Sequence, residues 1–155
     1  MNAPAFRVRA PRSPDELEAC LALRWRLLRA PWQQPRGSER DVFDDTAVHR
    51  LAEAADGRLI GTGRLHAVDE ACGQIRYMAV LPEWQGRGVG SALLASLEAA
   101  ARDIGCIRIR LNAREGAVGF YARRGYVDAG PGPLLFDSIR HRVMEKVVRR
   151  EPCGA

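Results

Sequence analysis

The sequence predicts a single α/β domain built around a mixed, mostly antiparallel sheet. With 155 residues, of which 46% are hydrophobic, the chain is large enough to bury one core of its own. Strand-like and helix-like patterns follow in the order β-α-loop-β-β-β-α-β-α-β-β, and the three consecutive strands in the middle indicate an antiparallel meander. We expect the domain to span residues 1–148 and a flexible tail to follow at residues 149–155.

The N-terminal part predicts a short strand over residues 5–10 and a helix that ends near Arg29. Ser13, Pro14 and Glu16 have the spacing of a helix N-terminus with a capping box. Apolar residues then recur every three or four positions, which is typical of a helix with one buried face.

Residues 30–45 predict an irregular connection, because prolines, a glycine and charged residues interrupt any periodic pattern. Long connections inside a compact domain are often binding loops. Trp32 is costly to expose without a partner. We therefore expect this loop to contact a substrate through Trp32, Glu39 and Arg40, and a mobile surface segment is the alternative.

The rest of the chain predicts a meander, a long helix and a second, shorter α/β stretch. Asp56-Gly57 is a strong hairpin signal because both residue types tolerate a positive φ. Gly105 and Gly125 follow the two helical patterns and are suited to end them. The expected strands cover residues 48–54, 59–68, 73–81, 107–111, 126–128 and 139–148, and the expected helices cover residues 92–104 and 116–124.

A glycine-rich turn joins the third strand of the meander to the long helix. Gly86, Gly88 and Gly90 occupy every second position. Glycine lets the backbone approach a ligand closely, and the first N–H groups of a helix are free to bind an anion. The turn does not fit a dinucleotide fingerprint, because Ser91 stands where the third glycine belongs, and it lacks the lysine of a P-loop. Two interpretations of the turn therefore stay open: it binds a phosphate group, or it is a purely structural turn.

The net charge, the lengths of the apolar runs and the cysteine spacing limit which partners and metals the sequence predicts. The formal net charge of +5 favours anionic partners in general, but the arginines are scattered and no nucleic-acid-binding motif accompanies them, so we expect no nucleic acid. No apolar run approaches the ~20 residues that cross a bilayer, and we expect a cytoplasmic protein without a membrane partner. The four cysteines have no metal-ligand spacing, so we expect reduced thiols, three of them buried, and no metal site.

Two segments together resemble a known family. Gln85-Gly86-Arg87-Gly88-Val89-Gly90 is similar to the pyrophosphate-binding signature Arg/Gln-x-x-Gly-x-Gly/Ala of the GNAT superfamily of acyl-CoA-dependent N-acyltransferases. Residues 120–126, with the sequence FYARRGY, are similar to its later Phe-Tyr-x-x-x-Gly-Phe/Tyr segment. The resemblance covers about residues 48–148 and implies a GNAT fold with helices on both faces of the sheet and a splayed strand pair at the cofactor site.

Residues 35–41, with His49 soon after, also resemble the acetyltransferase half of bacterial proteins that fuse a GNAT domain to a thioesterase-like domain. We expect this chain to carry the acetyltransferase half alone.

The resemblance implies a function and a set of site residues. The function is direct transfer of an acetyl group from acetyl-CoA to an amine in a ternary complex. Tyr121 matches the general acid that protonates the leaving thiolate and lies beside the cofactor. The other residues implied to bind acetyl-CoA are Met78, Ala79, Val80, Gln85, Gly86, Arg87, Gly88, Val89, Gly90, Ser91 and Asn112, the last at the end of its strand.

The general base is not fixed by the resemblance. Histidine titrates near neutral pH, and His49 and His141 both lie near strand starts that could open on a cleft, so we favour these two over His66, Glu39, Asp41 and Glu53. The acceptor is a small-molecule amine or an amine of a peptide or protein, and a homodimer is the candidate assembly. A non-catalytic acyl-CoA-binding or sensing module and an acyltransferase that works with an acidic carrier protein stay open as alternatives.

Overall fold

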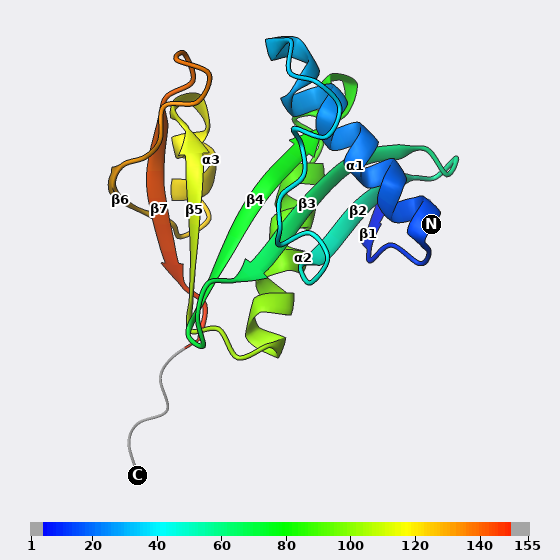
Figure 1. Cartoon of the computed structure of the whole chain (residues 1–155). Helices are drawn as coiled ribbons and strands as arrows, with labels where there is room; N and C mark the ends of the chain where they lie inside the picture. The colour runs from blue at the N-terminus through cyan, green and yellow to red at the C-terminus, as the bar shows by residue number, and fades with distance from the viewer. Residues whose placement is uncertain (1–4, 150–155) are drawn as a thin grey trace.

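A seven-stranded sheet organises the fold, in a computed structural model that describes residues 5–149 (Figure 1). The strands are β1 (Phe6–Arg9), β2 (Val48–Ala54), β3 (Leu59–Ala67), β4 (Cys72–Val80), β5 (Arg108–Arg114), β6 (Val127–Pro131) and β7 (His141–Val147). Their order in the sheet is β1-β2-β3-β4-β5-β7-β6. Only β4 and β5 pair in parallel, which confirms the predicted mixed, mostly antiparallel sheet.

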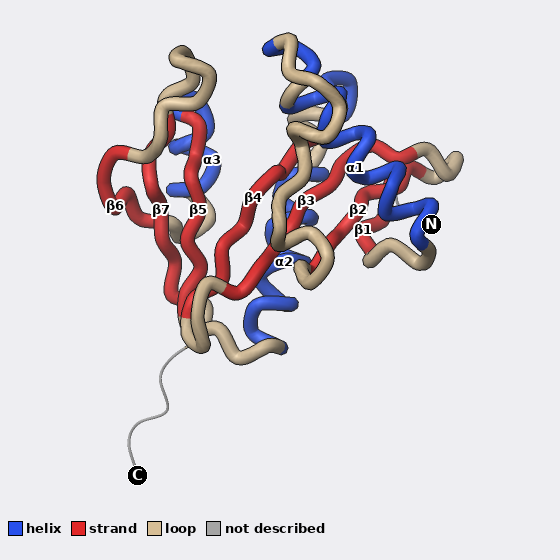
Figure 2. The backbone as a smooth tube through the Cα atoms, in the orientation of Figure 1, coloured by secondary structure: helices blue, strands red, loops and turns tan. Residues whose placement is uncertain are grey.

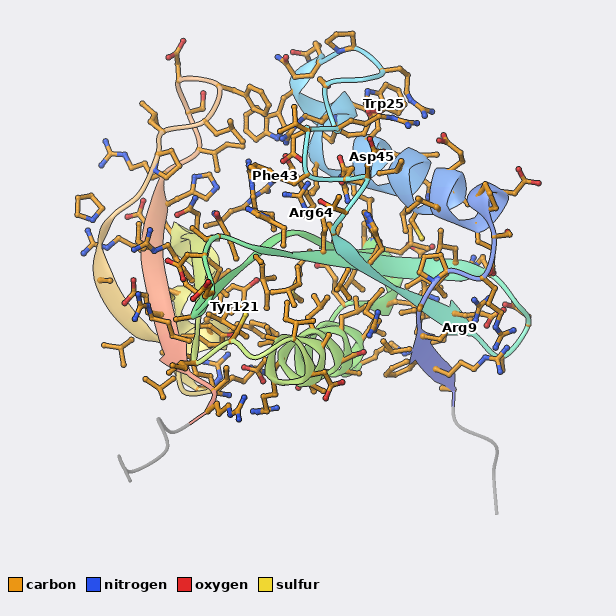
Figure 3. All side chains as sticks on the ribbon, turned by 60° about the horizontal axis from the view of Figure 1, so that its bottom comes forward. Arg9, Trp25, Phe43, Asp45, Arg64 and Tyr121 are labelled. Carbon is orange, nitrogen blue, oxygen red and sulfur yellow. The ribbon has the colours of Figure 1, made fainter. Side chains whose placement is uncertain are left out.

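Helices cover both faces of this sheet, as predicted. They are α1 (Pro14–Leu28), α2 (Val89–Asp103) and α3 (Val118–Ala122), with short 3₁₀ turns at Ala30–Trp32, Pro82–Trp84 and Glu115–Ala117. Figure 3 shows α1 on one side of the sheet and α2 on the other. The N-terminus of α1 is capped by the Ser13 hydroxyl, which accepts a hydrogen bond from the Glu16 amide at 3.1 Å.

Neighbouring residues of β3 face the two helices on opposite sides of the sheet. Gly63 lies against α2, where a Cβ atom would come within 2.9 Å of Leu97 Cδ1, so a larger residue would force Leu97 to move. Arg64, the next residue, points to the opposite face and is fully buried there with Arg24 of α1. On α2, the apolar residues Val89, Leu93, Leu97 and Ala100 are buried, whereas Ile104 lies beyond the helix end at Asp103 and is 52% exposed.

The sheet opens between β4 and β5. Their parallel pairing runs only from Cys72 opposite Arg108 to Ile75 opposite Leu111, and the two strands then diverge (Figure 2). At the point of divergence β4 has a bulge: Tyr77 adopts φ 59°, and the register with β3 shifts there. The splayed strand pair implied by the family resemblance is therefore present.

Several boundaries differ from the sequence-based expectation. α2 starts at Val89, so the last residues of the glycine turn form its first turn, and β5 continues to Arg114, which places Asn112 inside the strand. Three buried cysteines carry free thiols, as expected, and Cys153 lies outside the described residues, together with the expected tail from residue 150 on. Within residues 5–149, every helix falls short of the length and apolar character needed to cross a bilayer.

Candidate active site

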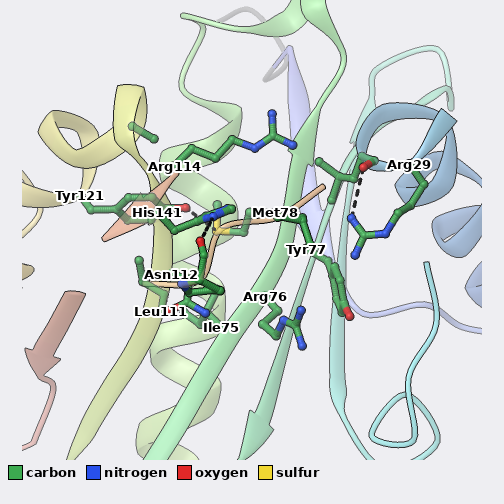
Figure 4. Close-up of a pocket in the computed structure, with 14 residues that line it drawn as sticks. Arg29, Ile75, Arg76, Tyr77, Met78, Leu111, Asn112, Arg114, Tyr121 and His141 are labelled. Carbon is green, nitrogen blue, oxygen red and sulfur yellow. Dashed lines mark hydrogen bonds between the residues drawn. The ribbon is translucent and has the colours of Figure 1, made fainter. Parts of the chain in front are cut away.

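A cavity of about 200 Å³ lies where β4 and β5 separate (Figure 4). Side chains from the end of α1, from α3 and from the loop between β6 and β7 close it. Its lining residues are Leu28, Arg29, Ile75, Arg76, Tyr77, Met78, Leu111, Asn112, Arg114, Ala117, Tyr121, Pro133, Leu135 and His141. Four of the residues that we singled out in the sequence, Met78, Asn112, Tyr121 and His141, thus line one cavity.

Tyr121 reaches the cavity from α3. Its hydroxyl lies 3.9 Å from Met78 Sδ of β4, a weak acceptor, and its ring packs edge-on against Phe120 and Tyr126. Burial raises the pKa of Tyr121 to about 12. The phenol therefore keeps its proton at neutral pH, and an incoming group can take the place of the weak sulfur acceptor.

His141 enters the cavity at the start of β7 (Figure 4). Its Nδ1 lies 2.9 Å from the carbonyl oxygen of Pro133. Because a carbonyl can only accept, Nδ1 must donate, and the neutral ring then has its lone pair on Nε2. This hydrogen bond fixes the orientation of the His141 ring, and its Nε2 can accept one proton.

The edge of β4 that faces the opening presents backbone polar groups. The Leu81 amide donates to Ile60 of β3 at 2.9 Å, and antiparallel ladders alternate, so the polar groups of Ala79 also face β3. The backbone groups of Met78 and Val80 point the other way, toward β5. The backbone groups of Ala79 therefore face β3 and not the opening, and a contact of Ala79 with the cofactor stays a prediction.

The glycine turn continues from this edge of β4. Gly86 and Gly88 adopt φ 75° and 89°, where an L side chain is strained. The first intrahelical hydrogen bond of α2 runs from the Ala92 amide to Gly88 O at 3.0 Å, so the amides of residues 89–91 precede it and have no intrahelical acceptor. Gln85 donates to Val80 O at 3.1 Å and fixes the start of the turn.

Two arginines border the turn. The guanidinium of Arg87 stacks 3.8 Å over the ring of Trp84. Arg124 of the segment after α3 donates from Nε to Ser91 Oγ at 3.2 Å and stacks on Phe120, so it adds a positive charge beside the first turn of α2. Arg124 could not be singled out from the sequence, since nothing there distinguishes it from its neighbour Arg123.

Comparison with known proteins decides the family. A family model described as the acetyltransferase (GNAT) family matches residues 17–126. The chain belongs to the GNAT acetyltransferase family. Acyl transfer is therefore the general class of its activity.

Solved structures share this GNAT fold over nearly the whole chain. An acyl-CoA N-acyltransferase from Pseudomonas aeruginosa is 24% identical, with a TM-score of 0.77 and coverage of 92% of this chain and 98% of the other. An aminoglycoside 6'-N-acetyltransferase, solved with coenzyme A, is 15% identical, with a TM-score of 0.76 and coverage of 94% and 99%. Ard1 from Thermoplasma volcanium is 21% identical, with a TM-score of 0.76 and coverage of 95% and 100%.

The loop residues expected to contact a substrate lie outside the cavity of this GNAT domain. Glu39 is fully buried, and its carboxylate accepts hydrogen bonds from the Gly37 amide at 2.8 and 2.9 Å. Arg40 pairs with Glu18 on the outside of α1 at 2.6 Å. Trp32 stacks on Phe136 with 6.1 Å between ring centroids. None of the three lines the cavity, and each already has a partner within the chain, so their contact with a substrate stays a prediction.

His49 does not open on the cavity either. It is 8% exposed, and its Nε2 lies 2.8 Å from the carbonyl oxygen of Asp44. Burial lowers the pKa of His49. The ring is therefore a neutral donor that holds the loop, and of the two favoured histidines only His141 is placed to act as a base.

A buried ion cluster holds the same loop on the sheet, and no local sequence pattern predicted it. Asp44 accepts hydrogen bonds from Arg24 at 2.9 Å and from Arg64 at 3.0 Å. Asp41 also pairs with Arg64 and accepts from the Tyr77 hydroxyl at 3.2 Å. These contacts hold Tyr77 at the bulge of β4, and thereby fix the point at which the cavity opens.

Proposed function

We propose that this domain transfers an acetyl group from acetyl-CoA to a primary amine, directly and without a covalent enzyme intermediate. The observation that carries the proposal is that the glycine turn contacts β4 at Val80 through Gln85, and the Tyr121 hydroxyl contacts β4 at Met78. These three features supply an anion site, hydrogen bonds for an extended arm and a proton donor, in that order. The cavity lining among the described residues contains no cysteine, serine or threonine that could carry the acetyl group.

The cofactor contacts follow from the chemistry of each group. The free amides at the start of α2 and the positive end of its dipole suit a pyrophosphate, and Arg124 adds charge beside them. The outward backbone groups of Met78 and Val80 suit the amides of the pantetheine arm, and the Asn112 side chain faces the same opening from β5. The coenzyme A in the aminoglycoside 6'-N-acetyltransferase structure supports this assignment.

Tyr121 and His141 divide the proton transfers between them. The neutral amine attacks the thioester carbonyl carbon, a C–N bond forms, and the C–S bond breaks. Tyr121 donates its hydroxyl proton to the leaving thiolate, since its raised pKa keeps it protonated. His141 Nε2 accepts the proton that the amine nitrogen must lose.

Two matched glycine substitutions test the cofactor site. Gly88 and Gly57 have φ 89° and 88°, and at both a Cβ atom would meet open space, so alanine is strained to a similar degree, by roughly 1–2 kcal/mol. Only Gly88 lies in the anion-binding turn. We expect Gly88→Ala to weaken acetyl-CoA binding about tenfold in calorimetric titration, since one misplaced turn removes amide contacts. Gly57→Ala should leave the affinity unchanged.

The wild-type protein provides the reference for this test. It should bind acetyl-CoA at micromolar concentrations. Absence of binding, or equal weakening by both substitutions, would show that the turn has no such role.

A further inference from the structure

The charged side chains around the cavity have one sign. Arg29, Arg76 and Arg114 line it, and no aspartate or glutamate does. The charge of Arg76 is partly neutralised by Asp41, whose Oδ2 lies 3.7 Å from Arg76 Nη1. Arg29 and Arg114 form no ion pair with any residue in the described range 5–149. An anion that enters the cavity is therefore attracted by two cations that have no carboxylate partner.

Arg29 is the unusual member of this set, because it is only 7% exposed. Its Nε donates to Ser38 O and its Nη1 to Leu28 O, each at 3.2 Å, so its partners are neutral carbonyls. The other two deeply buried arginines, Arg24 and Arg64, are both held by Asp44. A buried cation without a counter-ion is costly, and a ligand carboxylate would remove that cost.

The surroundings of Arg29 hold its guanidinium in a fixed position. Its Cζ lies 5.6 Å from the ring centroid of Tyr77 and 5.3 Å from that of Phe136. Nη2 donates no hydrogen bond within the described part of the chain and remains available to a ligand. A guanidinium that is positioned in advance loses little entropy when it binds a planar anion.

Arg29 lies on the acceptor side of the reaction centre. It follows α1, whereas the glycine turn begins α2, and these two helices cover opposite faces of the sheet (Figure 3). A pyrophosphate at the glycine turn therefore approaches from the other face. Arg29 is therefore placed to contact the second substrate and not the pyrophosphate.

We propose that Arg29, with Arg114 at the rim, binds a carboxylate of the acceptor, so that the acceptor is a small amino acid or the carboxylate-bearing end of a short peptide. This inference rests on the proposed acetyl transfer. The cavity of about 200 Å³ is smaller than those that hold drug-sized ligands, which fits an acceptor of this size. Arginine pairs with a carboxylate through two parallel N–H groups, which also orients the amine.

The same positive charge favours the reactive form of the amine. An ammonium near Arg29 and Arg114 is repelled, whereas the neutral amine is not, so these arginines lower the pKa of the bound amine. They also disfavour polycationic acceptors, in which no carboxylate compensates for the repulsion.

The test compares acceptors that differ only in charge. Thiol release from acetyl-CoA is measured with each standard amino acid, with its carboxamide, with aminoalkylphosphonates and with spermidine. We expect kcat/KM to be about 10- to 100-fold higher for the best carboxylate than for its carboxamide, as for a charged hydrogen bond. A preference for the phosphonates would identify a phosphate-type anion and overturn the carboxylate assignment.

Arg29→Gln should raise KM for the carboxylate at least tenfold, with a smaller change in kcat, and should remove most of the preference over the carboxamide. Arg26→Gln, an exposed arginine in the last turn of α1, is the matched control and should leave the preference intact. Arg114→Gln should act in the same direction more weakly, and it removes only an exposed side chain, so folding is preserved.

Two outcomes separate the two claims. Equal rates for the acids and their carboxamides, or an unchanged preference in Arg29→Gln, would overturn the carboxylate site and leave acetyl transfer intact. Absence of thiol release with every amine would overturn acetyl transfer itself, and the carboxylate inference with it.

Discussion

Tyr121→Phe lowers kcat about 100-fold or more and changes the affinity for acetyl-CoA little, if Tyr121 is the general acid. The substitution removes only the hydroxyl, which lies 3.9 Å from Met78 Sδ in the cavity, and keeps the ring that packs against Phe120 and Tyr126. The leaving thiolate then departs without a proton donor. Steady-state kinetics with saturating amine measure the loss in kcat, and calorimetry measures the affinity.

Tyr126→Phe is the matched control for the loss of a hydroxyl. Tyr126 donates to Glu98 at 3.0 Å in the core, away from the cavity lining, so its substitution should lower Tm and leave kcat unchanged. An unchanged kcat in Tyr121→Phe would exclude Tyr121 as the acid.

The pH dependence of kcat distinguishes the acid from the base. Tyr121 acts while protonated, and its pKa is raised to about 12, so no loss of activity from its ionisation is expected below about pH 10. Activity should instead fall toward low pH as the amine becomes protonated. His141→Gln should lower kcat, because it removes the imidazole nitrogen that accepts the proton of the amine.

Asp44→Asn destabilises the fold by about 3 kcal/mol, the second large effect that we expect. Asp44 is the carboxylate shared by Arg24 and Arg64, both about 1% exposed or less. Asparagine keeps the shape and removes the charge, so Arg24 loses its carboxylate partner and Arg64 keeps only Asp41. Urea denaturation at pH 7 measures the loss, with Asp45→Asn, an exposed neighbour, as the control near zero.

The same carboxylates give this stability a pH dependence of known sign. Burial opposes the ionisation of Asp41, but hydrogen bonds from Arg64 and the Phe43 amide outweigh burial and lower its pKa to about 2. The pKa of Asp44 is also lowered, because hydrogen bonds from the Asp41 amide and Arg24 outweigh burial. Their contribution is therefore present above about pH 4 and is lost as the pH falls toward 2. A difference between wild type and Asp44→Asn that persists unchanged at pH 2 would contradict this account.

Much of the fold could be predicted because its signals are local. The Ser13 cap of α1, the glycine turn before α2 and the Asp56-Gly57 hairpin each depend on residues a few positions apart, and each is found where expected. The carboxylate of Glu16 accepts from the Arg12 amide instead of the Ser13 amide, so the reciprocal half of the predicted capping box is not formed. The position of Tyr121 beside the cavity also followed from a local motif.

The features that the sequence did not reveal depend on distant partners. Glu39 is a charged loop residue by sequence, and only the fold shows that it is fully buried and held by the Gly37 amide. Asp44 and Arg64 are 20 positions apart, so no local sequence pattern predicts their ion pair. The bulge at Tyr77 and the alternation that turns Ala79 away depend on the register of β4 with β3. Burial of Arg29 without a carboxylate is likewise visible only when α1 is packed on the sheet.

The release of free coenzyme A thiol from acetyl-CoA, followed with and without a panel of amines, tests the central claim most directly. The account predicts release that depends on the amine, matches the amount of acetylated amine formed and leaves no acetyl group on the protein. Tight binding of acetyl-CoA with no amine-dependent release across the panel would contradict it, and would identify the protein as an acyl-CoA-binding module that does not turn its ligand over.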